Sequence, residues 1–334
     1  MGMAAAKWSG PAQLPGMDDA EFSRWVGLLE RRTGVVVPPD RKPFLVTGVR
    51  SRLRETGFAS FAAYFEQLLA GPRGAIEWAT LVDRLTVHQT HFFRHVPSLD
   101  LVAEQWLPAY LARGDVDAIH AWSVGCSTGE EAFTLAMALD RALDRLTAGK
   151  AYFGITATDI SAPALAVGRA ACYPRAKADE IPVDCQARYC EPDEEDSFRI
   201  VDALRRRVGF VQFNLMDIAR APLKRLDLVY CQNVLIYFAR ERRVALLDAL
   251  AALLKPGGHV PERSRPARRG GAMVAAPRGG HAPVAAGRRP GRAGRGGPGG
   301  SRRRRSGAGG GADAGRCGAD HPAASAIRAE RRAL

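Results

Sequence analysis

The sequence predicts a small all-helical domain followed by an α/β domain with a doubly wound, parallel sheet. From about residue 118 onward, short apolar runs alternate with helical patterns, which is typical of a parallel sheet covered by helices on both faces. Over residues 17–87, apolar residues recur at helical spacing between polar caps and glycine stops, without a strand pattern. The two parts are therefore expected to fold differently.

Polar caps and glycine stops delimit the helices of residues 17–87, because a cap accepts hydrogen bonds from unpaired N–H groups and glycine adopts the left-handed conformation that ends a helix. These positions are Asp18 or Asp19, Gly34, Asp40, Gly57 and Ser60. A further helix is expected from about residue 75, after a break at Gly71-Pro72. Its inward face is expected to consist of Ile76, Leu81, Val82 and Leu85.

Residues 118–260 are expected to form the sheet domain. The candidate strands are 119–124, 152–158, 209–213 and 226–231, and the candidate helices are 130–143, 163–171 and 240–254. Residues 198–201 are expected to belong to a small excursion from this sheet. Because only two residues of the domain follow Gly258, we expect the last strands to be missing, which would leave an unpaired edge.

Polar residues follow each predicted strand, at the edge where doubly wound sheets bind ligands. After the first strand comes Ser-Val-Gly-Cys-Ser-Thr-Gly-Glu-Glu at 123–131, a glycine loop that leads into a helix. Its glycines permit close approach to a ligand and its two glutamates favour a cationic one, although an ordinary β–α turn would also fit. Asp159 ends the second strand, where an acidic residue usually binds ribose hydroxyls.

The segment Leu-Thr-Val-His-Gln-Thr-His-Phe-Phe-Arg-His at 85–95 contains three histidines. No carboxylate or cysteine partner follows, and the three do not share one helical face, so no metal site is predicted.

The formal net charge of +13 belongs entirely to residues 261–334, which hold 17 Arg, no Lys and four acidic residues. The other 260 residues hold 31 basic and 31 acidic residues, so the folded body is not expected to bind a specific nucleic acid. The segment 261–334 also holds 17 Gly, 17 Ala and no aromatic residue, and it is predicted to be disordered because it cannot bury enough apolar surface.

Two explanations of this segment stay open. Arg, Gly, Ala and Pro have codons that begin with two G or C letters, so a GC-rich gene read out of frame from about codon 259 would produce this composition. The alternative is a genuine Arg/Gly tail that binds RNA or acts as a linker. The nucleotide sequence after codon 258 distinguishes the two.

Composition further indicates a soluble protein. No apolar run reaches the ~20 residues that span a bilayer, so no membrane insertion is expected. Residues 1–16 lack the apolar core of a signal peptide and are expected to be flexible. The six cysteines include no Cys-x-x-Cys pair, which favours a reducing, cytoplasmic location.

Three segments, in order, resemble the CheR family of chemotaxis receptor methyltransferases. Residues 88–94 resemble its Asn-x-Thr-x-Phe-Phe-Arg motif, residues 127–131 its Ser-Thr-Gly-Glu-Glu motif, and residues 231–238 its Cys-Arg-Asn-Val-x-Ile-Tyr-Phe motif. His88 and Gln232 depart from the family's Asn and Arg. The His-Gln-Thr sequence at 88–90 is similar to that of the PilK branch of the family, which is attached to type IV pilus chemosensory systems.

The resemblance extends over residues 17–258 and implies a domain plan. It consists of a receptor-docking helical domain (17–87), a linker with a connecting helix (88–117) and a Rossmann-like domain that binds S-adenosylmethionine (118–260).

The resemblance also assigns site residues. The implied cofactor-binding positions are His88, Thr90, Arg94, Glu131, Asp159, Asn214, Leu215, Asn233 and Val234. The implied catalytic positions are Arg94, which would orient the substrate carboxylate, and Tyr237, which would donate a hydrogen bond to it.

The implied reaction is methyl transfer from S-adenosylmethionine to glutamate side chains of methyl-accepting chemoreceptors by a monomeric enzyme. Two alternatives stay open: a truncated, catalytically impaired methyltransferase, and a nucleic-acid-binding protein that acts through its Arg/Gly tail. A base-amino methyltransferase would carry a Pro-Pro-aromatic element where this chain has Asn-Val-Leu-Ile at 233–236.

The second predicted helix carries Arg50, Arg52 and Arg54, which would form a docking face for acidic receptor helices or simply a solvated charged surface. Residues 191–201 are acid-rich and contain no glycine, which argues against tethering to a receptor pentapeptide.

Overall fold

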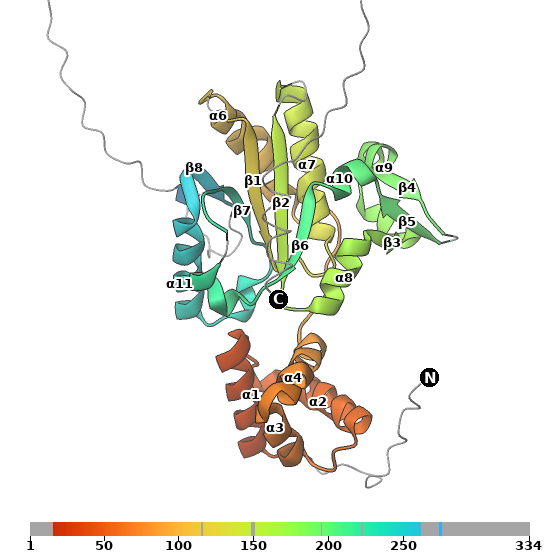
Figure 1. Cartoon of the computed structure of the whole chain (residues 1–334), viewed down its shortest axis with the longest axis vertical. Helices are drawn as coiled ribbons and strands as arrows, with labels where there is room; N and C mark the ends of the chain where they lie inside the picture. The colour runs from red at the N-terminus through yellow and green to blue at the C-terminus, as the bar shows by residue number, and fades with distance from the viewer. Residues whose placement is uncertain are drawn as a thin grey trace, which may run out of the picture. The chain divides into compact units, whose positions relative to one another are not determined.

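The structure is a computed structural model that describes residues 16–114, 116–147, 151–194, 196–221 and 223–261 and the backbone of residues 274–275. Its first part is helical, as predicted (Figure 1). The elements are α1 (Asp19–Thr33), the 3-10 turn η1 (Pro39–Arg41), α2 (Lys42–Thr56), α3 (Phe61–Leu69) and α4 (Gly71–Leu85).

The caps explain where most of these helices begin and end. Asp18 accepts a hydrogen bond from the Glu21 N–H at 2.7 Å, and Ser60 accepts one from the Ala63 N–H at 3.2 Å. Gly34 and Gly57 end their helices with φ of 76° and 82°. These four predictions are confirmed.

Three local predictions were wrong. Asp40 does not cap α2, because it lies inside η1 and makes no capping hydrogen bond. Gly71-Pro72 is not a break before the helix, because α4 begins at Gly71 and Pro72 lies in its first turn, where its missing N–H costs nothing. Ile76 is 72% exposed, whereas Leu81, Val82 and Leu85 of the same helix are buried.

The helical domain has its own aromatic core. Trp25 contacts Tyr64 and Phe65, with ring centroids 5.9 and 5.0 Å apart. The Tyr64 hydroxyl donates to Glu77 at 2.5 Å, and Arg52 binds the same carboxylate with two hydrogen bonds of 2.8 Å. The carboxylate raises the pKa of Arg52, and burial raises the pKa of Tyr64. Arg52 of α2 therefore stabilises the packing of α2 against α4, which carries Glu77.

A helical run connects this domain to the sheet. It consists of α5 (Val96–Asp100), the π-helical turn η2 (Leu101–Trp106) and α6 (Leu107–Leu111). Buried residues of this run, Leu99, Val102, Trp106 and Leu107, belong to the core beneath one face of the sheet.

The main sheet has the strand order β6-β2-β1-β7-β8-β9, and all its pairs except β8–β9 are parallel. The strands are β1 (Ala118–Val124), β2 (Tyr152–Asp159), β6 (Val208–Gln212), β7 (Leu226–Tyr230), β8 (Leu254–Val260) and β9 (Val274–Ala275). The intervening helices are α7 (Glu130–Thr147), α8 (Ala162–Ala170), α10 (Asp202–Arg205) and α11 (Arg240–Ala252), with the 3-10 turns η4 (Leu215–Arg220) and η5 (Leu235–Tyr237).

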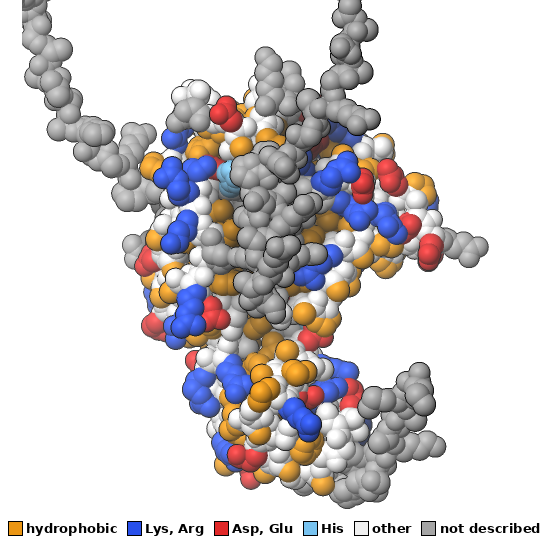
Figure 2. Space-filling model, in the orientation of Figure 1, with side chains coloured by type: hydrophobic (Ala, Val, Ile, Leu, Met, Phe, Trp, Pro, Cys, Tyr) orange, Lys and Arg blue, Asp and Glu red, His pale blue; other side chains and the backbone are white. Residues whose placement is uncertain are grey.

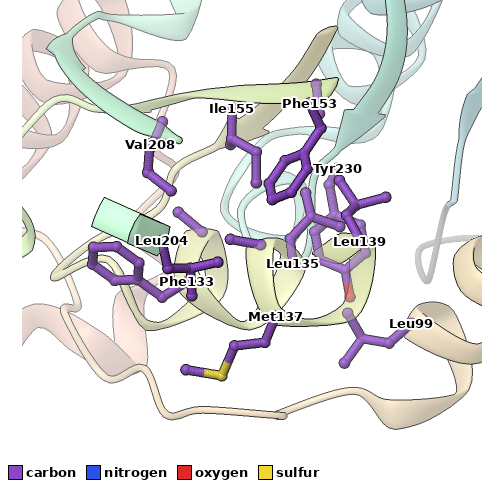
Figure 3. Packing of buried hydrophobic residues seen from close by; sticks show 14 of the residues in the cluster. Leu99, Phe133, Leu135, Met137, Leu139, Phe153, Ile155, Leu204, Val208 and Tyr230 are labelled. Carbon is purple, nitrogen blue, oxygen red and sulfur yellow. The ribbon is translucent and has the colours of Figure 1, made fainter. Parts of the chain in front are cut away.

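Helices pack on both faces of this sheet. Ile119 and Ala121 of β1 share a core with α7, whereas Trp122 and Val124 of the same strand share another with α11. Figure 3 shows Leu135 and Leu139 of α7 beside Phe153 of β2. This arrangement confirms the predicted doubly wound α/β fold.

The C-terminal edge of the sheet differs from the prediction. Helix α11 ends at Ala252, and residues 254–260, which were not predicted as a strand, pair with β7. Gly257, with φ of 83°, lies where the register between β7 and β8 shifts. The Pro-Gly-Gly sequence at 256–258 is not typical of a strand, and pairing with β7 stabilises the strand there. Val274–Ala275, inside the segment predicted to be disordered, pairs with β8. The open question of a frameshift falls on residues that are mostly outside the described ones.

A small antiparallel sheet with the order β3-β5-β4 confirms the predicted excursion. Its strands are β3 (Cys172–Pro174), β4 (Cys190–Pro192) and β5 (Ser197–Ile200), and the 3-10 turn η3 (Arg175–Glu180) and α9 (Val183–Tyr189) connect β3 to β4. No helix among the described residues is long and apolar enough to cross a membrane.

Candidate active site

A cavity of about 380 Å³ lies at the carboxyl ends of β1, β2 and β7 and is also lined by residues of the helical domain and the linker. Its volume suits a small-molecule cofactor. All ten positions singled out from the sequence line it: His88, Thr90, Arg94, Glu131, Asp159, Asn214, Leu215, Asn233, Val234 and Tyr237.

The glycine loop that follows β1 forms one wall of the cavity. Gly125 has φ of 70°, and a Cβ atom there would collide with the Val234 side chain. The N–H groups of Gly125 and Cys126 donate to the Thr158 carbonyl at 2.7 and 2.9 Å, which holds the loop against the end of β2. Ser127 adopts φ of 50°, an uncommon conformation for a non-glycine residue. The loop is thus held in one strained shape.

Glu131, at the start of α7, lines the cavity with its carboxylate held in place. Its Oε1 accepts a hydrogen bond from the Ser123 hydroxyl at 2.8 Å. Burial raises the pKa of Glu131 to about 8, and the Asp159 charge adds to the rise, whereas Arg94 opposes it. Because ionising this buried carboxyl group costs free energy, a cationic ligand beside it would stabilise its charged form.

Glu130 does not face the ligand, contrary to the expectation that both glutamates would. Its side chain is fully buried, pairs with Lys177 and accepts a hydrogen bond from the Thr128 hydroxyl at 2.6 Å. Lys177 also donates to the Thr90 carbonyl at 3.3 Å. The pair therefore joins the glycine loop to the linker instead of binding a ligand.

Asp159 ends β2 with both carboxylate oxygens in use by the backbone. One oxygen accepts from the Ser127 N–H at 2.8 Å and the other from the Ser161 N–H at 2.9 Å. Each carboxylate oxygen has a second lone pair, which can accept from a ligand hydroxyl.

The linker 88–94 reaches the cavity as an irregular segment held at several points. The Phe92 N–H donates to Glu180 at 2.7 Å, and the Phe93 N–H donates to the Thr134 hydroxyl at 3.1 Å. Arg94 is exposed and donates to the Gln89 carbonyl at 2.8 Å. The His88 ring contacts Thr86 and Asp83, so this histidine braces the end of α4. Among the described residues, no cluster suited to a metal ion is present.

Asn214, Asn233 and Tyr237 also line the cavity. The Asn214 amide donates to the Arg32 carbonyl at 2.7 Å, and its oxygen accepts from the Met216 N–H at 3.0 Å, so it joins the two domains. Asn233 has φ of 59° and begins the turn that leads to η5, which carries Tyr237.

Sequence reasoning missed several lining residues. Tyr230, at the end of β7, donates to or accepts from Ser98 at 2.5 Å, and burial raises its pKa. Val36, Arg41 and Phe44 of the helical domain also line the cavity. No local pattern marks these three residues of the helical domain, because only the contact between the two domains brings them to the site.

The parallel sheet, glycine loop and acidic strand end define a Rossmann-like methyltransferase that binds S-adenosylmethionine. The chain belongs to the CheR methyltransferase family. The family model for the S-adenosylmethionine-binding domain matches residues 88–261, and the model for the all-alpha domain matches residues 20–86.

Relatives of known name support this assignment. The chain is 29% identical over 245 residues to a chemotaxis protein methyltransferase of Borreliella burgdorferi, covering 72% of this chain and 85% of that protein. It is 28% identical to chemotaxis protein methyltransferase Cher2 of Pseudomonas putida, covering 72% and 87% of the two chains. It is 31% identical to a chemotaxis protein methyltransferase of Vibrio parahaemolyticus, covering 73% and 88%.

Proposed function

We propose that this protein transfers the methyl group of S-adenosylmethionine to glutamate side chains of methyl-accepting chemoreceptors and so forms glutamate methyl esters. The observation that carries this proposal is the convergence of all ten sequence-predicted residues, from segments far apart in the chain, on one cavity. The names of the relatives support the chemotaxis context. We further propose that it acts as a cytoplasmic monomer.

The cavity fits the cofactor's chemical groups. Glu131 would bind the ammonium group, because a partly desolvated carboxylate gains from a nearby cation. The free lone pairs of Asp159 would accept from the ribose hydroxyls. Asn214 and Leu215 would lie beside the adenine, where Asn214 keeps one amide N–H beyond the bond to Arg32. Asn233 and Val234 would line the space beside the sulfonium.

The bound cofactor supplies an electrophilic methyl group attached to a cationic sulfur. A substrate glutamate has a pKa of about 4.3 in water and is already ionised at neutral pH, so the protein needs no general base. Arg94 would orient the carboxylate by charge-assisted hydrogen bonds, and Tyr237 would donate a hydrogen bond to it. The protein then accelerates methyl transfer by holding the carboxylate oxygen, the methyl carbon and the sulfur in line and by excluding water.

The test is receptor methylation by the full chain, with a purified cytoplasmic fragment of a methyl-accepting chemoreceptor and tritium-labelled S-adenosylmethionine. We expect base-labile labelling of the receptor, and Arg94→Ala and Tyr237→Phe are each expected to lower kcat/KM by about 100-fold. S-adenosylhomocysteine binding, measured by calorimetry, should persist in Tyr237→Phe. Full activity in both variants would refute the two catalytic assignments.

For the docking surface on α2, the structure narrows the candidate residues. Arg52 is only 13% exposed and is paired with Glu77, so it is not available to a partner. Arg54 is exposed, whereas Arg50 is half-buried beside the Phe61 ring. On the face drawn in Figure 2, the helical domain carries basic, acidic and hydrophobic side chains intermixed. We therefore propose Arg54 as the main docking cation.

Reversing this charge tests the docking role. Arg54→Glu is expected to raise KM for the receptor fragment about threefold to tenfold at low salt, with kcat and cofactor affinity unchanged. Arg31→Glu, the same change at an exposed position on α1, serves as the control. Equal KM values for the two variants would favour a merely solvated charged helix.

A further inference from the structure

The stretch that follows α1 is paired with the polypeptide around Tyr237. The Val36 N–H donates to the Tyr237 carbonyl at 2.9 Å, and Val35 forms an isolated antiparallel bridge with Phe238. One turn earlier, the Arg32 carbonyl accepts from the Asn214 amide at 2.7 Å. The helical domain therefore contacts the Tyr237 segment through main-chain hydrogen bonds in addition to side-chain packing.

Gly34 makes this contact possible. Its φ of 76° turns the chain at the end of α1, and the backbone there lies directly against the Phe238 ring. A Cβ atom at this position would lie 2.7 Å from the Met216 Sδ and 2.8 Å from the Phe238 Cδ1. Both distances are well inside van der Waals contact, so a side chain at residue 34 would displace the Met216 side chain and the Phe238 ring, next to Tyr237.

The Tyr237 segment is a short turn whose position depends on contacts from outside it. Leu235 and Phe238 pack into the core beside α11, and Arg243 of α11 donates to the Phe238 carbonyl at 3.3 Å. The segment lies on η5, a turn of three residues without a side-chain cap, which follows Asn233 at φ of 59°. Within the turn the Tyr237 N–H donates to the Val234 carbonyl at 3.2 Å and the Phe238 N–H to the Leu235 carbonyl at 3.1 Å. A single turn closed by two hydrogen bonds is easily displaced, so contacts from outside the turn, those of the helical domain among them, help to decide where the Tyr237 side chain lies.

We propose that residues 34–36, together with the Arg32 carbonyl, form a clamp by which the helical domain positions Tyr237 for methyl transfer. This inference rests on the proposed function, because Tyr237 is assigned a role only there. The helical domain then completes the active site as well as docking the receptor. A displacement of about 1 Å in a catalytic group is sufficient to lower a rate by up to about 100-fold.

The chain offers a matched pair of variants. Gly34→Ala and Gly57→Ala both place alanine at a left-handed helix stop, with φ of 76° and 82°, but a Cβ at Gly57 meets nothing within 4 Å. Both variants carry the same backbone strain, and only Gly34→Ala disturbs the clamp. We expect Gly34→Ala to lower kcat for receptor methylation by about tenfold or more and Gly57→Ala to stay within about twofold of the wild type.

A double-variant cycle identifies the residue through which the clamp acts. In a Tyr237→Phe background, Gly34→Ala is expected to cause little further loss, because the group that it displaces has already been removed. Val36→Pro, which deletes the N–H donor without adding bulk at residue 34, is the second variant and should reproduce the kcat loss. Wild-type kcat in Gly34→Ala and Val36→Pro, or a full additional loss in the Tyr237→Phe background, would overturn the proposal.

Hydrogen–deuterium exchange gives a readout that does not require receptor methylation. Faster exchange at residues 235–238 is expected in Gly34→Ala and not in Gly57→Ala. Unchanged exchange would also overturn the clamp. If the wild type binds S-adenosylhomocysteine but labels no receptor, the proposed function fails while this measurement still tests the clamp.

Discussion

Replacing Glu131 by glutamine is expected to abolish tight cofactor binding and, at pH 8, to stabilise the ligand-free protein. The first effect follows because the substitution removes the carboxylate that would face the cofactor's ammonium group, and we expect the affinity for S-adenosylhomocysteine to fall by about 100-fold. The hydrogen bond from Ser123 is retained, since glutamine keeps an oxygen at the same place.

The stabilisation follows from the direction of the pKa shift. Burial raises the pKa of Glu131 to about 8 in the folded protein, from an ordinary value of 4.5. Between these values the unfolded chain loses the proton while the folded protein keeps it, so the free energy of unfolding decreases as pH rises to about 8. The total loss is on the order of 5 kcal/mol, because each unit of the rise is worth about 1.4 kcal/mol, and Glu131→Gln should remove it.

Binding is coupled to the same proton. An ammonium group near Glu131 lowers the pKa of this carboxyl, so cofactor binding at pH 7 is expected to release a proton, and the affinity is expected to rise between pH 6 and 8. Calorimetry in two buffers of different ionisation enthalpy measures the proton release, and thermal unfolding from pH 5 to 8.5 measures the stability. Glu241→Gln, on the exposed side of α11, is the control. A Glu131→Gln protein with wild-type affinity at pH 7.5 would rule out the proposed ligand contact.

Lys177→Met is expected to destabilise the protein by about 3–5 kcal/mol, because it leaves the fully buried Glu130 carboxylate without its cation. Among the described residues, the Thr128 hydroxyl would then be the remaining hydrogen-bond donor to this carboxylate. The Thr90 carbonyl would lose its bond to Lys177 at the same time, so the linker should loosen next to the cavity.

Urea unfolding measures this effect, with Lys224→Met at an exposed position as the control. The double variant Lys177→Met with Glu130→Gln is expected to recover part of the loss, since a neutral amide costs less to bury than an unpaired carboxylate. An exposed ion pair contributes at most about 1 kcal/mol to the free energy of unfolding. If Lys177→Met lowers this free energy by no more than that, the pair with Glu130 contributes little to stability.

Local chemistry was sufficient to predict much of this protein. Asp18 and Ser60 cap their helices, and Gly34 and Gly57 end theirs, because a cap or a stop depends on residues within one turn. The ten site residues were named from the resemblance to the CheR family, in its motifs or at the ends of predicted strands, and all of them line the cavity. Their roles in binding and catalysis remain predictions.

Predictions failed where a residue's surroundings come from distant parts of the chain. Residues 254–260 became a strand because β7 offers unpaired backbone groups, although Pro256 and two glycines disfavour a strand locally. Arg52 was expected to belong to a docking face or to a solvated charged surface, but Glu77, on another helix, binds it. Glu130 and Glu131 are adjacent in sequence, yet one is paired with Lys177 and the other faces the cavity.

The sequence by itself determined most of the helices, the four central strands and ten of the residues that line the cavity, because periodicity, caps and motifs act over a few residues. The tertiary structure alone decided which of the two glutamates faces a ligand, which arginine stays free, and how Gly34 lies against Phe238. The physical reason is that burial, ion pairing and close backbone approach depend on groups brought together from separate segments, and no local pattern encodes those neighbours.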